Sequence, residues 1–328
     1  MKKGLLLVLA IFAAFVLVGC GNSATKKDDL KVALAITGSK TDGGWNQTAY
    51  EGLVQVQEKL GAKVSYSENV TASDYERVLR DYAKDGNKVV IGHGYEFSDA
   101  ALAVGAEYPD TFFIVTSSSV TNNKNVGSLN NNYLQAGFMQ GVFAAMMTKS
   151  NVVAGVGGGQ IPPIVDDLAG FIAGAKYINP NIKALTAITG SFDDANKAKE
   201  QALAFVNQGA DVLMVDADAG GRGVYVAAEE KGLFAIGSIA AEYDTYAKSL
   251  ISCATADMAT AIFKNVEEIS KGTYKAQFEL MGVKEGIVDF TYSPKLDSQI
   301  PKEVKDKIAE VKAKLSSGEI DVTKLIVK

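Results

Sequence analysis

The chain has 328 residues, of which 47% are hydrophobic and 22% charged, so it is long enough for two globular domains and excludes both a single small domain and a disordered protein. Its 33 basic and 38 acidic residues give a net charge of −5, which leaves no basic field for nucleic acid and excludes it as an expected partner. Two cysteines and one histidine exclude a disulfide framework and a histidine-rich metal site, and we expect no metal and no cofactor.

The N-terminus carries a predicted export signal. Two lysines precede an apolar run over residues 5–18, and residues 17–20 read Leu-Val-Gly-Cys, which resembles a lipobox. The pattern predicts a signal peptide over residues 1–19, cleavage before Cys20 and a lipid anchor on its sulfur. A plain signal peptide or a retained membrane anchor is the alternative. The small, polar segment 20–30 is expected to be a flexible tether at the extracytoplasmic face of the cell membrane.

The rest of the chain alternates apolar, β-rich runs with amphipathic runs. In the first half, strands are predicted at 31–37, 64–66, 89–91 and 112–116, and helices at 47–60, 75–85 and 98–107. The second half repeats this order, with strands at 152–157, 184–188, 212–215 and 234–236, and helices at 165–177 and 224–231. This order predicts two doubly wound α/β lobes, which bind ligands at the carboxyl ends of their strands.

Two aromatic residues follow predicted strands, one in each half. Trp45 lies in a glycine-flanked polar loop and Phe192 in a similar loop of the second half, so a planar ligand can lie between them when the lobes close. Packing at a helix start or in a hinge is the alternative for each. Asn46 has a donor and an acceptor suited to a base edge or a sugar hydroxyl, but asparagine is also a common helix cap.

Other strand-end loops are polar. Asp216, Asp218 and Arg222 can address sugar hydroxyls or be solvated loop charges, and His93 can contact ligand or be a hydrogen-bonded residue at a strand end. The glycine-rich segment 155–160 has glutamine where the dinucleotide fingerprint requires its last glycine, and the sequence has no nucleophile elbow. We therefore expect a binding protein and not an enzyme.

Short motifs spread over the chain support a family resemblance. They are DGGWNQ at 42–47, YERVLR at 75–80, NVGSL at 125–129, AGFMQG at 136–141, GQIP at 159–162, GSFDD at 190–194, GADV at 209–212 and GVKEG at 282–286. Together they resemble the basic membrane protein family of bacterial ABC-transporter substrate-binding lipoproteins, which includes purine nucleoside receptors. The resemblance implies a periplasmic-binding-protein type I fold, a monomer, a small-molecule ligand, and ABC permease and ATPase subunits as partners.

The family's three hinge crossovers are expected near Asn130, Ser252 and Val283. They place residues 31–130 and 253–283 in lobe 1, and residues 131–252 and 284–328 in lobe 2. By the same resemblance, aromatic side chains at 45 and 192 flank a base and the amide at 46 reads its edge. The glycine at 221, with its neighbour, and the lysine at 284 are expected to hold ribose.

Two departures concern the ligand. Relatives that bind nucleosides usually have an aspartate where this chain has a serine run beginning at Ser117, and another in a segment that here ends at Glu242. The hydroxyl groups of residues 117–119 are expected to replace the first carboxylate and Glu242 the second. A purine nucleoside or nucleobase is the predicted ligand. A sugar or flavin, or a sensory or adhesive role for the same fold, is the alternative.

Overall fold

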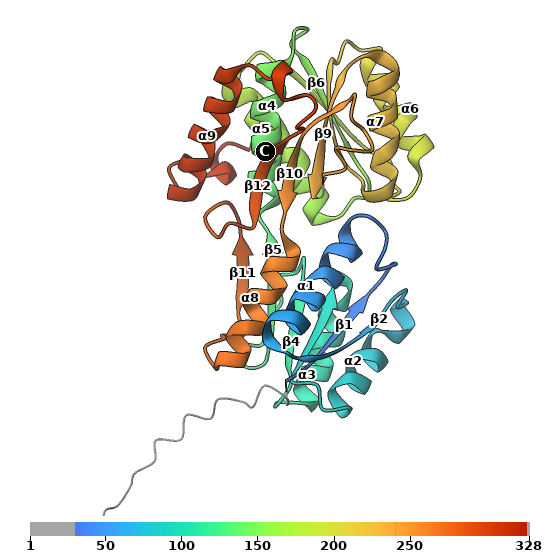
Figure 1. Ribbon diagram of the computed structural model, residues 1–328, viewed down its shortest axis with the longest axis vertical. Helices are drawn as coiled ribbons and strands as arrows, with labels where there is room; N and C mark the ends of the chain where they lie inside the picture. Colours follow the sequence, from blue (N-terminus) through green and yellow to red (C-terminus); the bar gives the residue numbers. More distant parts are fainter. Residues whose placement is uncertain (1–29, 240, 327–328) are drawn as a thin grey trace, which may run out of the picture.

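The computed structural model describes residues 30–239 and 241–326, which form two α/β lobes joined by a neck (Figure 1). The sheet of the first lobe has the order β11-β5-β4-β3-β1-β2, and all neighbouring strands are parallel. Its strands are β1 (Lys31–Ile36), β2 (Lys63–Ser67), β3 (Val89–His93), β4 (Phe112–Thr116), β5 (Val126–Asn131) and β11 (Phe278–Met281).

The sheet of the second lobe has the order β12-β10-β9-β8-β6-β7 and is parallel except for β12, which runs antiparallel to β10. Its strands are β6 (Val152–Gly157), β7 (Lys183–Ile188), β8 (Val212–Asp216), β9 (Phe234–Ile239), β10 (Leu250–Ala256) and β12 (Val288–Tyr292). The two sheets therefore repeat the order of elements expected from the two halves of the sequence.

Helices cover both faces of the first sheet. α1 (Trp45–Leu60) and α8 (Met258–Lys271) pack on the face that carries Val32 and Leu34, while α2 (Tyr75–Lys84) and α3 (Ser98–Glu107) pack on the face that carries Ala35. Successive side chains of a strand point to opposite faces, so a strand covered on both faces is apolar throughout. This explains the continuous apolar runs in the sequence.

The second sheet is covered in the same way. α4 (Tyr133–Met147), α5 (Pro162–Ile178) and α9 (Lys302–Ser317) pack on one face, and α6 (Ala195–Val206) and α7 (Arg222–Lys231) pack on the other. α4 and α5 lie unusually close together, because glycines face the partner backbone at their crossing. A Cβ at Gly137 would lie 1.9 Å from the Asp167 carbonyl oxygen, and one at Gly174 would lie 2.0 Å from the Phe138 carbonyl oxygen.

Three chain segments connect the lobes in the neck (Figure 1). The first follows β5, the second follows β10, and the third joins β11 to β12 and contains Val283. The boundary expected near Ser252 falls inside β10, which pairs with β9 and β12 along its length. The chain leaves the second sheet only after Ala256, because Ser252 is a buried strand residue in that sheet and not part of a connection.

Membrane attachment concerns another part of the chain. Across residues 30–239 and 241–326, no helix combines the length and apolar character needed to cross a membrane. The expected signal peptide, Cys20 and the tether up to residue 29 lie outside the described residues.

Candidate ligand site between the lobes

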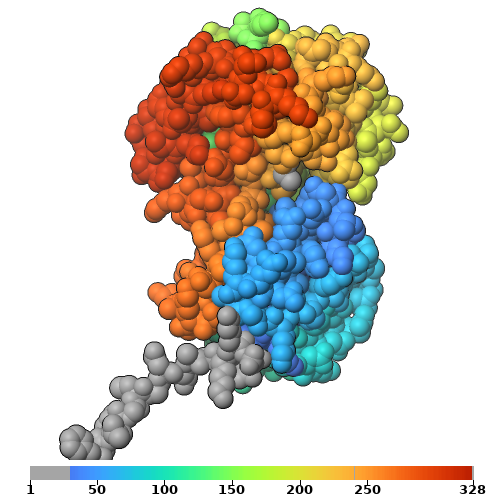
Figure 2. Space-filling view, in the orientation of Figure 1, coloured from blue at the N-terminus to red at the C-terminus, as the bar shows by residue number. Residues whose placement is uncertain are grey.

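A cavity of about 520 Å³ lies between the lobes, at the carboxyl ends of strands from both sheets, and Figure 2 shows the lobes meeting at a waist. Small-molecule sites commonly measure ~300–1,000 Å³. The first lobe lines the cavity with Thr37, Gly38, Ser39, Asp42, Trp45, Asn46, Asn69, Gly94, Tyr95, Glu96 and Ser117, and the second with Tyr133, Ile161, Pro163, Ile164, Phe192, Asp193, Asp216, Asp218 and Ile239.

Trp45 provides an aromatic surface in the first lobe. It is the first residue of α1 and is partly buried. Its ring stacks on the imidazole of His93, with ring centroids 4.1 Å apart and an angle of 26° between the planes. Stacking on a buried ring restricts the indole, so that it presents a fixed surface to the cavity.

His93 is held in turn by a chain of hydrogen bonds. Its Nε2 lies 3.0 Å from the Trp45 carbonyl oxygen, and its Nδ1 lies 2.8 Å from Thr116 Oγ1. The carbonyl can only accept, so Nε2 carries the proton, Nδ1 accepts from the Thr116 hydroxyl, and that hydroxyl accepts from the Gly94 N–H at 2.9 Å. Complete burial lowers the pKa of His93 to about 3, and the imidazole is neutral at physiological pH. His93 therefore positions Trp45 from outside the cavity.

Asp42 organises the loop that precedes α1. Its carboxylate accepts hydrogen bonds from the backbone N–H groups of Gly44 (2.9 Å), Asn46 (2.9 Å) and Gln47 (3.1 Å), which stabilises the start of the helix. The Asn46 side chain donates to Asp42 Oδ2 at 2.8 Å and accepts from the Gly38 N–H at 3.3 Å. Asn46 lines the cavity, but much of its hydrogen-bonding capacity maintains this loop.

Phe192 provides the aromatic surface of the second lobe. Its ring lies on the backbone of Gly158 and Gly159, where added Cβ atoms would each lie 2.5 Å from a ring carbon. The backbone carbonyl of Phe192 also accepts a hydrogen bond from the Gly220 N–H at 2.6 Å. The glycine-rich segment that resembles a dinucleotide fingerprint therefore serves here as a flat support for an aromatic ring.

Acidic groups converge on the cavity from both lobes. Asp216, at the end of β8, is 3% exposed, and burial raises its pKa to about 6. Asp218 begins the short 3₁₀ helix η3 (Asp218–Gly221), and burial together with the nearby Asp42 raises its pKa to about 7, against the opposing effect of the Trp45 backbone N–H. No lysine or arginine is among the described residues that line this cavity.

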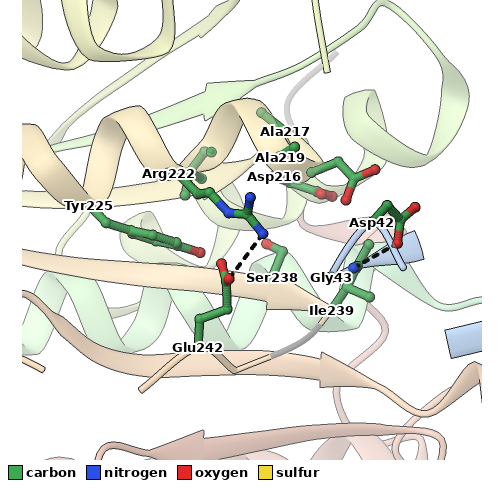
Figure 3. A pocket seen from close by; sticks show the side chains of 14 residues that line it. Asp42, Gly43, Asp216, Ala217, Ala219, Arg222, Tyr225, Ser238, Ile239 and Glu242 are labelled. Carbon is green, nitrogen blue, oxygen red and sulfur yellow. Dashed lines mark hydrogen bonds and ion pairs between the residues drawn. The ribbon is translucent and has the colours of Figure 1, made fainter. Parts of the chain in front are cut away.

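A smaller cavity of about 30 Å³ lies beside the first and shares Asp216 and Asp218 with it. Figure 3 shows Arg222 reaching across this cavity to Glu242, and the two side chains form an ion pair at 3.2 Å. Gly221 lines the same cavity. Glu242 and Gly221, expected to hold ribose, therefore lie next to the main cavity and not in its wall.

Several residues in the wall of the main cavity have a strained backbone. Asn69, Ser117, Asp218 and Ile239 have φ values of 55°, 50°, 46° and 67°, in the left-handed region that residues other than glycine rarely adopt. Ile239 is the most unusual of them because its side chain is β-branched. Strained backbone is concentrated at binding and catalytic sites, so this cluster favours a functional role for the cavity.

Of the eight candidate ligand-binding residues, the structure brings five to the main cavity: Trp45, Asn46, Ser117, Phe192 and Asp216. Lys284 is exposed on the turn between β11 and β12 and is absent from the walls of both cavities. The turn folds on itself, since the Gly282 N–H donates to the Glu285 carboxylate at 2.8 Å and Gly286 has a φ of 70°. This local geometry keeps Lys284 in the neck.

Sequence reasoning missed Tyr133 in the cavity wall and Asp167 beneath it. Asp167 is 1% exposed on α5 and lies on the same helix face as the buried Ile164 and Phe171. An acidic residue at helical spacing among apolar residues was the available signal, because such a position predicts a buried carboxyl group.

Residues 29–325 match the model of a family described as ABC transporter substrate-binding protein PnrA-like. The chain is 30% identical to the transcriptional activator protein med of Bacillus subtilis, over 91% of this chain and 93% of that protein. It is 26% identical to a purine-binding protein of Brucella abortus (96% and 88%), and 34% identical to the ABC transporter nucleoside-binding protein BmpA of Lactococcus lactis (69% and 68%).

Solved structures agree with the family match. An ABC transporter solute-binding protein from Conexibacter woesei superimposes with a TM-score of 0.76 at 27% identity, over 91% of this chain and all of that one. The fold is therefore the periplasmic-binding-protein type I arrangement of two α/β lobes. Solute-binding proteins of this kind bind ligands without catalysing a reaction, and those of importers act outside the cytoplasm. The chain belongs to the PnrA-like family of ABC transporter substrate-binding proteins, also called the basic membrane protein family.

Proposed function

We propose that this protein captures a purine nucleoside or nucleobase between Trp45 and Phe192 and delivers it to an ABC permease and ATPase. The observation that carries the proposal is that these two aromatic side chains, from opposite lobes, line one cavity of about 520 Å³. A base stacked on an aromatic side chain gains ~1–3 kcal/mol. The purine-binding and nucleoside-binding relatives add support.

The charge of the cavity narrows the ligand class. Its described wall has the carboxyl groups of Asp42, Glu96, Asp193, Asp216 and Asp218 and no basic side chain. A phosphate group would be repelled there, whereas hydroxyl and amino groups find acceptors. An uncharged nucleoside or base therefore suits the cavity better than a nucleotide.

Anchoring and delivery belong to the same proposal. A lipid on Cys20 would hold the folded lobes near a permease in the membrane through the polar segment that follows. Ligand would favour the closed arrangement because only that arrangement lets both aromatic surfaces contact the base. Labelling with a radioactive fatty acid, and its loss in Cys20→Ser, tests the anchor.

Isothermal titration calorimetry tests the ligand proposal. The protein, purified in detergent and refolded to remove carried-over ligand, is titrated with purine and pyrimidine nucleosides, nucleobases, riboflavin and sugars. Trp45→Ala and Phe192→Ala are each expected to weaken binding of a purine by ~1–3 kcal/mol. Tyr177→Ala, which removes a partly exposed aromatic side chain on α5 outside the cavity, is the control. Unchanged affinity in both cavity variants would contradict the site.

A sensory role is the second candidate, because the relative from Bacillus subtilis is named a transcriptional activator. Uptake of a labelled nucleoside separates the two roles. Loss of uptake in a strain lacking this protein supports transport. Normal uptake together with altered gene expression supports sensing.

A further inference from the structure

Two buried carboxyl groups meet beneath the second-lobe wall of the main cavity. Asp167 on α5 and Asp216 at the end of β8 are 1% and 3% exposed, and their side chains are hydrogen bonded to each other. Two ionised carboxylates in contact at a buried site repel one another strongly, so such a pair keeps one proton between them.

The hydrogen bonds show how that proton is placed. Asp167 Oδ2 accepts from Ser238 Oγ at 3.3 Å, whereas Asp167 Oδ1 and Asp216 Oδ2 are both buried with no other partner in the described chain. One proton between these two oxygens satisfies both. Gln140 Nε2 donates to Ser238 Oγ at 2.8 Å and fixes the direction of that hydroxyl group.

Asp167 is the member that keeps the proton. Burial and the neighbouring Asp216 raise the pKa of Asp167 well above its ordinary value, whereas the hydrogen bond from Asp167 lowers the pKa of Asp216 against the effect of burial. The lack of a side chain at Gly137 brings the α4 backbone against Asp167 and excludes water from this side. Asp167 therefore acts as a neutral donor and Asp216 as the carboxylate.

Asp216 also faces the ligand space. It lines both the main and the smaller cavity, and no hydrogen bond to another described side chain occupies its Oδ1. We propose that Asp216 is a specificity-determining acceptor for an N–H or O–H group of an uncharged ligand, and that Asp167 is a positioning residue that orients it through the shared proton. The inference rests on the proposed function, because it assigns a role within the same cavity.

The charged state of Asp216 makes ligand binding sensitive to pH. Protonation of Asp216 near pH 6 removes the charged acceptor, so affinity is expected to fall by up to about tenfold per pH unit below that point. Other titratable or charged groups face the pair from neighbouring elements: Tyr133, Asp166, Asp218, Arg222, Tyr225, Glu242 and Cys253. Of these, Asp218 titrates closest to Asp216, near pH 7.

The test measures the Kd of adenosine by calorimetry from pH 5 to 8.5 in the wild type and three variants. Asp216→Asn is expected to weaken binding at pH 8 at least tenfold and to abolish the step near pH 6. Asp167→Asn keeps a donor toward Asp216, so affinity at pH 8 should stay within about threefold of wild type while the step moves to lower pH. Asp218→Asn should leave the step near pH 6 in place.

Two further measurements cover the remaining outcomes. Adenosine 5′-monophosphate should bind at least tenfold more weakly than adenosine. If adenosine does not bind to the wild type, the proposed ligand fails, and the ¹³C NMR titration of the aspartate carboxyl carbons decides the proton pair by itself. An Asp216 signal that titrates at an ordinary carboxyl pKa, or unchanged adenosine affinity in Asp216→Asn, would overturn the inference.

Discussion

The two sides of the cleft support their walls with opposite chemistry. In the first lobe, a base lies beneath the wall: buried His93 has lost its proton and stacks under Trp45. In the second lobe, an acid lies beneath the wall: buried Asp167 keeps its proton and contacts Asp216. Burial favours the uncharged form in both places.

The comparison predicts opposite responses to acid. The folded-state pKa of His93, about 3, is below its unfolded value of 6.5, so its contribution to stability is present above pH 6.5 and is lost as pH falls toward 3. The folded-state pKa of Asp216, about 6, is above its unfolded value of 3.8, so its contribution is present below pH 3.8 and is lost as pH rises through 6. Acid therefore weakens the first lobe and strengthens the second.

Replacing His93 tests the larger of these effects. His93→Gln preserves a donor toward the Trp45 carbonyl but does not titrate. A single proton changes the free energy of unfolding by ~1.4 kcal/mol per pH unit, so the wild type should lose about 3 kcal/mol relative to the variant between pH 6.5 and 4.5. Urea unfolding at several pH values measures this difference.

His93 is the single histidine of the chain, so no other imidazole contributes once a purification tag has been removed. The variant is expected to be less stable at pH 7.5, because it loses the ring that stacks on Trp45. Parallel stability curves for the two proteins between pH 6.5 and 4.5 would show that His93 is not buried in its neutral form.

The sequence alone was sufficient for the fold and for both aromatic surfaces. Strands covered on both faces leave continuous apolar runs, and α3 occupies the predicted range, 98–107. Trp45 and Phe192 could be selected because each follows a strand end, where the parallel topology places ligands. These features depend on local patterns, and local patterns are visible in one sequence.

The supporting groups could not be predicted in the same way. Asp167 and Asp216 are 49 positions apart, and their contact depends on how closely α5 approaches β8 and α4. His93 was known to follow a strand, but its stack with Trp45 depends on the loop shaped by Asp42. Lys284 shows the opposite error: a resemblance placed it in the cavity, whereas the turn at Gly286 leaves it exposed.

Gly158 tests how the second wall is held. A Cβ there would lie 2.5 Å from the Phe192 ring and 3.1 Å from the Ala217 Cα. Gly158→Ala is therefore expected to destabilise the protein by ~1–2 kcal/mol through overpacking. In a Phe192→Ala background the same change should cost much less, because the ring is absent. Equal costs in the two backgrounds, measured by urea unfolding, would place the strain elsewhere.

The ion pair between Arg222 and Glu242 is expected to give the smallest effect. Its atoms are 3.2 Å apart, but the two side chains are 41% and 28% exposed, so solvent screens the attraction. Arg222→Gln should change the free energy of unfolding by less than ~1 kcal/mol, and the change should shrink further in 0.5 M salt. Glu242→Gln is the matched variant, and the double variant completes a cycle.

A larger, salt-independent cost would mean that Arg222 acts through another contact. The structure offers one, because a Cβ at Gly43 of the first lobe would lie 2.8 Å from Arg222 Nη2. The guanidinium group would then help to hold the lobes together without ligand. A small cost instead leaves ligand contact with Trp45 and Phe192 as the main force for closure, in agreement with walls that are each supported within their own lobe.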